Sequence, residues 1–409
     1  MKVLVITAPG LRPDYLGCYG SDWVDTPNFD QLAAAGIVFD NHHAIQPDGD
    51  GACQAWRTGT YRFPAVFSNG GSREFSEQPD LLTLLNAKAV DTYLIADAGR
   101  PSSKDFSQGW KTFRPSMSMD SHLKAIHKAI VQQANKENTL LWVDLPVLLP
   151  PWQIPDDFIA AYFQKPADED ADESSPAEED DRPVPQIDPQ PGVFASLDDG
   201  FLLQLQHTYA AAVTYLDTIL GQVLEWLADA DPEDQWLLIV TSQHGISLGE
   251  HGLIDRARPW LHDERIHVPL ILRLPGGVEA GRRVFALTQP VDVPATLLEV
   301  FNLPAMGMDG QSLLHLAYGK QDRVRPYSCS GWQLGDEIEF ALRTPEWKLI
   351  LSSGNLSQPS IRDRQLYVKP EDRWEVNNVV QHHFELAEEL EQKLKEFATK
   401  FSGEPPARA

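Results

Sequence analysis

The stretch KVLVIT (residues 2–7), followed at once by APG (residues 8–10), is the part of this chain that decides its fold class. A short apolar run that stops at a turn is typical of a strand buried on both faces of a sheet. Three similar runs follow, at TYLIA (92–96), TLLWV (139–143) and WLLIVT (236–241). Helical patterns lie between them, at residues 81–89, 120–133 and 202–228. This alternation predicts an α/β fold with a mostly parallel central sheet flanked by helices.

Beyond residue 319 the pattern changes. Short apolar runs at residues 340–343 and 347–351 alternate with turns, and an amphipathic stretch at 384–397 closes the chain. We therefore expect an α/β domain over residues 1–319 and a small C-terminal α+β subdomain over residues 320–409. This subdomain should be an antiparallel sheet with one helix packed on it.

Residues 165–192 differ from the rest of the chain in composition. Nine acidic residues fall between Asp168 and Asp181, among Ser, Ala and Pro. Like charges and prolines cannot bury a core, so we predict an acidic, disordered surface insert in the α/β domain. Docking of a basic partner is the alternative use of such a segment.

The overall charge excludes some partners. The 409 residues carry a formal net charge of -25, which repels nucleic acid and anionic membrane surfaces. No apolar run is long enough to span a bilayer, and the first residues are too short for a signal-peptide core. The three cysteines lack the spacing of a disulfide framework or a zinc site. We expect a cytoplasmic protein that binds neither nucleic acid nor membrane.

Six stretches in order resemble one known family. They are LRPDYLGCYG (11–20), TPNFDQLAAAGIVFDN (26–41), TSQHGISLGEHGL (241–253), HVPLILRLPG (267–276), PVDVPATLLEVFNLP (290–304) and RTPEWKLIL (343–351). Together they resemble the sulfatase family of the alkaline phosphatase superfamily. The resemblance implies the same α/β fold with a small C-terminal subdomain. It also implies a formylglycine nucleophile, made from Cys or Ser in a C/S-x-P-S-R motif, and a divalent cation held by aspartates.

The chain departs from the family pattern where that chemistry lies. Pro9 and Gly10 stand where relatives carry paired aspartates after the first strand, and Gln243 replaces the late aspartate. The nucleophile position corresponds to Gly49, within the glycine-rich run DGDG (48–51), which we predict to be a turn. Cys53 lies four residues further on without the Pro-x-Arg context, so we expect a buried, inert thiol. These residues predict no metal and no cofactor at the family's site.

Three basic residues of the family pattern remain at or near their positions. His244 follows Gln243, His251 lies in GEHG, and Arg256 stands where relatives carry a lysine. Two interpretations stay open: a small anion pocket for sulfate, phosphate or carboxylate, or structural remnants with local hydrogen bonds.

Together these observations leave two functions. The first is a sulfatase-like pseudoenzyme, which lacks the formylglycine mechanism and acts by binding a small anionic ligand or a protein partner. The alternative is an active hydrolase of sulfuric esters or phosphoesters with an altered mechanism. The pocket residues that we carry forward are Gly49, Cys53, Gln243, His244, His251 and Arg256.

Overall fold

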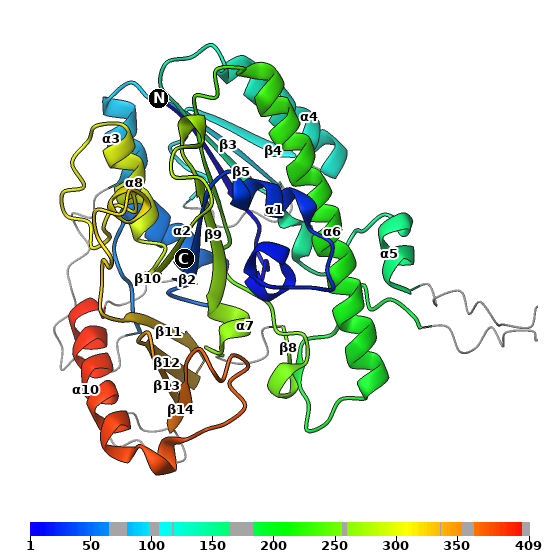
Figure 1. Ribbon diagram of the computed structural model, residues 1–409, viewed down its shortest axis with the longest axis vertical. Coiled ribbons are helices and arrows are strands. Elements are labelled where there is room, and N and C mark those ends of the chain that lie inside the picture. Colours follow the sequence, from blue (N-terminus) through cyan, green and yellow to red (C-terminus); the bar gives the residue numbers. More distant parts are fainter. Residues whose placement is uncertain are drawn as a thin grey trace, which may run out of the picture.

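The computed structural model describes residues 1–64, 80–97, 106–116, 118–163, 183–255, 260–335, 337–352 and 364–402. Within them the largest element is an eight-stranded sheet with the order β10-β2-β9-β7-β1-β5-β3-β4 (Figure 1). Its strands are β1 (Lys2–Thr7), β2 (Ile37–His43), β3 (Asp91–Asp97), β4 (Thr112–Ser116), β5 (Thr139–Asp144), β7 (Trp236–Thr241), β9 (His267–Arg273) and β10 (Arg282–Thr288). Strand β9 runs antiparallel to its neighbours β2 and β7, and the other pairings are parallel. The predicted α/β class with a mostly parallel sheet is confirmed.

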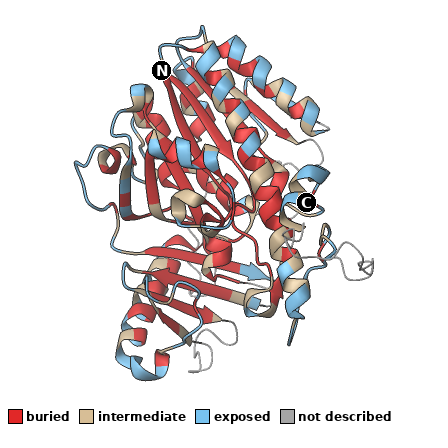
Figure 2. Ribbon diagram, turned by 45° about the vertical axis from the view of Figure 1, so that its right-hand side comes forward, coloured by how far each residue is buried: buried red, intermediate tan, exposed pale blue. Residues whose placement is uncertain are grey.

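Helices cover both faces of this sheet, and the side chains of β1 point alternately into the two cores that result. Leu4 and Ile6 pack into the core beneath α1 (Pro27–Ala34), α4 (Met119–Gln133) and the long α6 (Asp199–Ala230). Val3 and Val5 face the opposite core, with α2 (Gly49–Thr58), α3 (Leu81–Ala87), α8 (Asp292–Val300) and α9 (Leu314–Ala317). Figure 2 shows the sheet buried between helices whose outer faces are exposed.

A second sheet lies at one end of the molecule (Figure 1). Its antiparallel strands are β11 (Ser328–Leu334), β12 (Glu337–Arg343), β13 (Trp347–Ser352) and β14 (Arg364–Val368). Helix α10 (Phe384–Phe401) packs Leu390 and Leu394 against Phe340 on one face of this sheet. The other face contacts Leu261 and Ile266 of the α/β part. This small sheet with one helix is the C-terminal arrangement that the sequence predicted.

The acidic insert is described only at its C-terminal end. Residues 164–182 lie outside the described residues. Residues 183–192 follow a defined path: Gln186 N donates to Thr208 Oγ1 of α6 (2.9 Å), and Trp152 N donates to the carbonyl of Ile187 (2.9 Å). The prediction of disorder is therefore wrong for residues 183–192, because the half-buried Ile187 packs against the core. Within the described ranges, no helix has the length and apolarity that crossing a bilayer requires.

Candidate functional site

The carboxyl ends of β1, β5 and β7 meet at one edge of the large sheet. Thr7, the last residue of β1, pairs in register with Asp144 of β5 and with Thr241 of β7. This edge is where open α/β sheets usually bind ligands. The loops that follow the strands are tied together, because Gly10 N donates to the carbonyl of His244 (2.9 Å) and Ser242 Oγ donates to that of Ala8 (2.7 Å).

Asp144 is buried at this edge with only 3% of its surface exposed. Its Oδ1 accepts hydrogen bonds from Thr7 Oγ1 (2.8 Å) and from Gln243 Nε2 (2.8 Å). Calcium in proteins takes six to eight oxygen ligands, with several carboxylates among them. Among the described residues at the ends of β1, β5 and β7, Asp144 is the single carboxylate, and its Oδ1 already accepts two hydrogen bonds. This group does not fit the family's cation.

Gly49 is the first residue of helix α2, so the predicted turn over residues 48–51 is wrong. Asp48 caps the helix, with its Oδ1 accepting from Gly51 N (2.9 Å), which offsets the low helix propensity of the glycines. Arg265, which is 1% exposed, reaches this end of α2 and donates from Nη2 to the carbonyl of Pro47 (2.5 Å). Cys53 is buried in the core between α2 and the sheet, as expected.

The remaining predicted site residues divide between two places. His244 is buried near the strand ends, and its Nδ1 donates to the carbonyl of Gly245 (2.7 Å). His251 lies elsewhere, on the wall of a large pocket. Arg256 lies outside the described residues. Gln243 and His244 therefore lie together near the strand ends. His251 lines the pocket, and Gln243 and His244 do not.

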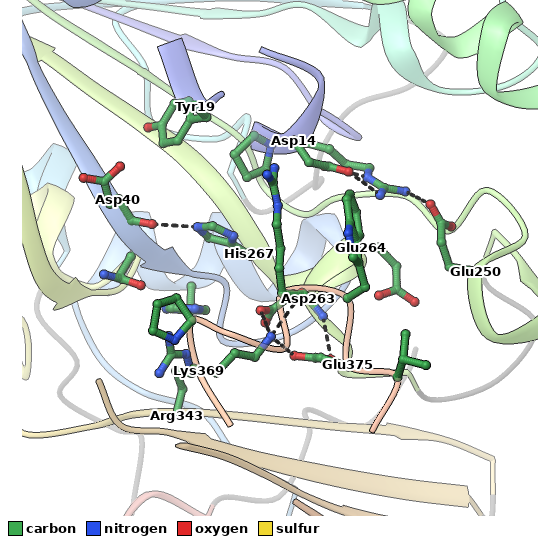
Figure 3. Close-up of a pocket in the computed structure, with 18 of the residues that line it drawn as sticks. Asp14, Tyr19, Asp40, Glu250, Asp263, Glu264, His267, Arg343, Lys369 and Glu375 are labelled. Atoms are coloured by element: carbon green, nitrogen blue, oxygen red, sulfur yellow. Dashed lines mark hydrogen bonds and ion pairs between the residues drawn. The ribbon is translucent and has the colours of Figure 1, made fainter. Parts of the chain in front are cut away.

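The pocket has a volume of about 860 Å³ and lies between the edge of the large sheet and the C-terminal subdomain (Figure 3). Volumes of this size suit small-molecule ligands. Its polar lining residues include Arg12, Asp14, Asp40, Glu250, His251, Asp263, Glu264, His267, Arg343, Lys369, Arg373 and Glu375. Apart from His251, none of these was predicted as a site residue, because the pocket joins segments far apart in the sequence.

A buried ion network forms the floor of the pocket. Asp263 pairs with Lys348 (2.7 Å) and Lys369 (2.7 Å), and both lysines also lie 2.8 Å from Glu375 Oε1. Burial raises the pKa of Asp263, but the two ammonium groups outweigh burial and hold that pKa well below its usual range. The four charges cancel, so this network joins the α/β part to the C-terminal subdomain without leaving a net charge.

Two arginines present positive charge to the pocket. Arg343 is buried, its Nε has no hydrogen-bond partner in the described part of the chain, and burial lowers its pKa. Arg373 is exposed at the rim, with its guanidinium 5.0 Å from the ring centre of Trp374. Arg12, in contrast, is neutralised by Asp14 (2.6 Å) and Glu250 (2.6 Å). Arg343 and Arg373 are therefore the cations best placed to contact an anion.

One group of side chains beside the pocket could hold a metal ion. His251, His262 and Glu264 each offer one ligand atom, and these three atoms lie within 4.8 Å of one another. Among the described residues, no other group of three such side chains lies as close together. Burial raises the pKa of Glu264, but the hydrogen bond with His251 and the charge of His262 lower it to about 2. This group could not be predicted from the sequence, because His262 and Glu264 lie outside the family motifs used above.

Two family models match the chain. The model described as "Sulfatase" matches residues 2–303, and the model described as "N-sulphoglucosamine sulphohydrolase, C-terminal" matches residues 249–400. Human iduronate 2-sulfatase is 26% identical over 363 residues, which cover 73% of this chain and 65% of that protein. The multifunctional alkaline phosphatase superfamily protein PehA of Trinickia caryophylli is 32% identical over 170 residues, covering 41% of this chain and 31% of PehA. The chain thus spans less than two thirds of the length of either relative.

Solved structures share the fold over almost the whole chain. The structure of BT4656 in complex with its substrate D-glucosamine-2-N,6-O-disulfate has a TM-score of 0.74 at 17% identity and covers 98% of both chains. The phosphonate monoester hydrolase of Agrobacterium radiobacter has a TM-score of 0.73 at 17% identity, over 98% of this chain and 96% of that one.

Proposed function

The chain belongs to the sulfatase family, and we propose that it binds a sugar sulfate or sugar phosphate instead of hydrolysing one by the formylglycine route. The ligand site is the pocket around Arg343 and Arg373. The observation that carries the proposal is the hydrogen bond from Gln243 to Asp144 at the strand ends, together with a glycine at the start of α2.

The first support concerns the chemistry that the strand ends permit. A glycine at position 49 has no side chain that could be oxidised to an aldehyde. The carboxylate of Asp144 accepts hydrogen bonds from Thr7 and Gln243, and the described residues at these strand ends offer no second carboxylate for a divalent cation. Without a nucleophile and a cation, the negative charge of a sulfuryl-transfer transition state has no stabilising partner at this edge.

The second support concerns the anion. Guanidinium groups bind sulfate and phosphate oxygens through paired N–H donors, and these charge-assisted hydrogen bonds are stronger than neutral ones. The guanidinium of Arg343 lines the pocket, and Arg373 adds a second guanidinium at the rim.

The third support concerns the sugar. Phe285 and Trp374 line the pocket and are 71% and 54% exposed. The flat faces of these two aromatic side chains suit the apolar face of a sugar ring. The names of related proteins agree with a sugar ligand, since BT4656 is described with a disulfated glucosamine as its substrate.

Calorimetric titration of the full chain with N-acetylglucosamine 6-sulfate, glucose 6-phosphate and uncharged N-acetylglucosamine tests this function. We expect the two esters to bind and the uncharged sugar to bind at least about tenfold more weakly, since one charge-assisted hydrogen bond is worth about 1.5–3 kcal/mol. Arg373→Gln should weaken ester binding by a similar factor, whereas Arg323→Gln, which changes an exposed arginine outside this pocket, should not. Equal affinity for charged and uncharged sugars, or no effect of Arg373→Gln, would refute the proposed site.

A further inference from the structure

His251, His262 and Glu264 come together from a loop and a short helix. His251 lies in the segment Glu250–Gly252, His262 immediately precedes α7 (Asp263–Ile266), and Glu264 lies within α7. The ring centres of the two histidines are 4.3 Å apart, and His251 Nδ1 is 3.3 Å from Glu264 Oε1. The distance between Nδ1 and Oε1 is about that between two ligand atoms which each lie about 2.0–2.1 Å from one tetrahedral ion.

The ring of His251 is oriented by a backbone carbonyl. Its Nε2 lies 3.1 Å from the carbonyl oxygen of Glu375, which can only accept a hydrogen bond, so Nε2 carries the proton. Its Nδ1 faces the carboxylate of Glu264, which also only accepts, so Nδ1 is protonated in the metal-free chain and a metal ion would take the place of that proton. A hydrogen bond of this kind from the second ring nitrogen is what fixes the tautomer of metal-binding histidines.

His262 supplies an independent observation. This side chain is fully buried, and its Nε2 has no hydrogen-bond partner within the described part of the chain. Its Nδ1 lies 2.8 Å from Glu375 Oε2, which places a carboxylate behind the ring and leaves Nε2 for another partner. A buried ring nitrogen without a hydrogen-bond partner is costly, and a metal ion would supply the partner that Nε2 lacks.

The charges favour a cation at this point. Asp263 and Glu375 are balanced by Lys348 and Lys369, as described above. The buried carboxylate of Glu264 has no lysine or arginine partner among the described ion pairs, and Trp260 Nε1 donates to its Oε1 (2.6 Å). Two neutral histidines and this carboxylate would leave a divalent ion with one net positive charge.

We propose that His251, His262 and Glu264 bind a divalent transition metal of the zinc class, with Glu375 as the positioning residue behind both rings. Two imidazoles and one carboxylate suit Zn²⁺ or Co²⁺, whereas Ca²⁺ prefers six to eight oxygens. His251 and Glu264 also line the large pocket, so a bound ion would lie at its wall; Figure 3 shows Glu264 among the lining residues. This site lies apart from Gln243 and Asp144, and it contrasts with the absence of metal expected from the sequence.

Metal titration of the full chain without any sugar ester tests the site. After removal of metal by a chelator, we expect one Zn²⁺ per chain to bind in competition with a chromophoric chelator. Co²⁺ should give the visible absorption of a four- or five-coordinate ion. Zn²⁺ should also raise the melting temperature by mass action, and Ca²⁺ should not.

Conservative variants separate ligation from folding. Glu264→Gln keeps an oxygen for Trp260, and His251→Asn suits the left-handed backbone at position 251, where φ is 55°. Each should weaken Zn²⁺ binding by at least about 10- to 100-fold while the metal-free protein remains folded. His315→Ala, which changes a half-exposed histidine paired with Glu299, is the matched control and should keep full affinity.

Three outcomes would overturn the site. They are a wild-type chain that binds neither Zn²⁺ nor Co²⁺ specifically, a Ca²⁺ affinity equal to that for Zn²⁺, and wild-type metal affinity in the folded Glu264→Gln and His251→Asn proteins. None of these depends on whether sugar esters bind, so a failure here is distinct from a failure of the proposed function.

Discussion

Gln243 Nε2 donates a 2.8 Å hydrogen bond to Asp144 Oδ1 across the ends of β7 and β5, the two strands that flank β1. A side-chain amide here supplies a donor to the buried carboxylate, whereas a second carboxylate would repel it. A hydrogen bond between a neutral amide and a carboxylate thus links the two strand ends.

Gln243→Asp should therefore destabilise the protein. Two carboxylates would face each other in a buried site, and the lost hydrogen bond plus the uncompensated charge should lower the free energy of unfolding by roughly 2–4 kcal/mol at pH 7. Urea denaturation measures this, with the exposed Gln321→Asp as control. The deficit should shrink as the pH falls, because one of the two carboxyls then takes up a proton. A stability equal to wild type would show that the pair does not need the amide.

Stability should also fall in mild acid because two histidines are buried in their neutral form. Burial lowers the pKa of His42 to about 3 and that of His122 to about 4, whereas an unfolded chain has ordinary histidines near 6.5. Below pH 6.5 the unfolded state binds more protons, so stability should decline toward pH 4 by up to about 1.4 kcal/mol per pH unit for each histidine.

Urea denaturation between pH 6.5 and 5 tests this in His42→Gln. The variant should lose part of the wild-type slope, and the exposed His382→Gln serves for comparison. If the slope of His42→Gln equals that of the wild type, then His42 is not the neutral buried group that the structure places beside Thr288.

The ion network beneath the pocket should depend on Lys348, which is fully buried. Lys348→Met leaves Asp263 and Glu375 with one ammonium group between them, so we expect a loss of about 3–5 kcal/mol in the free energy of unfolding. Adding Asp263→Asn should restore part of this loss, as expected for coupled sites. The exposed pair Lys124–Asp120 provides the control, where Lys124→Met should cost about 0.5 kcal/mol or less.

Cys53 should remain an ordinary thiol. Its side chain is 1% exposed in the core beneath α2, out of reach of modifying proteins and reagents in the folded state. Peptide mass spectrometry of the purified chain should find unmodified cysteine at this position, and thiol reagents should label it only after denaturation. Formylglycine at position 53 would show that the nucleophile was assigned to the wrong residue.

The sequence predicted the main sheet because its central strands are continuous apolar runs, as in KVLVIT and WLLIVT. It missed β2 and β10 as strands, since IVFDNHH and RRVFALT mix charged or polar residues with apolar ones near the sheet edge. Helix α2 was missed because Gly49 and Gly51 disfavour a helix, and the cap by Asp48 depends on three-dimensional geometry.

The pocket could not be predicted for a different reason. Asp263 and Glu375 are joined through lysines of the C-terminal subdomain, and no local pattern links residues so far apart. His251 was identified from its motif, but its partners His262 and Glu264 are set by the path of the loop before β9. Charges that meet through tertiary structure leave no periodic signal in the sequence.

The most direct test of the central claim is hydrolysis of an aryl sulfate by the unaltered chain, followed by absorbance at neutral pH. We predict no turnover above that of a heat-denatured sample, with or without added calcium, because Gly49 offers no nucleophile and the strand ends offer no cation site. An activity that copurifies with the protein through successive columns and is abolished by His244→Ala would contradict the account.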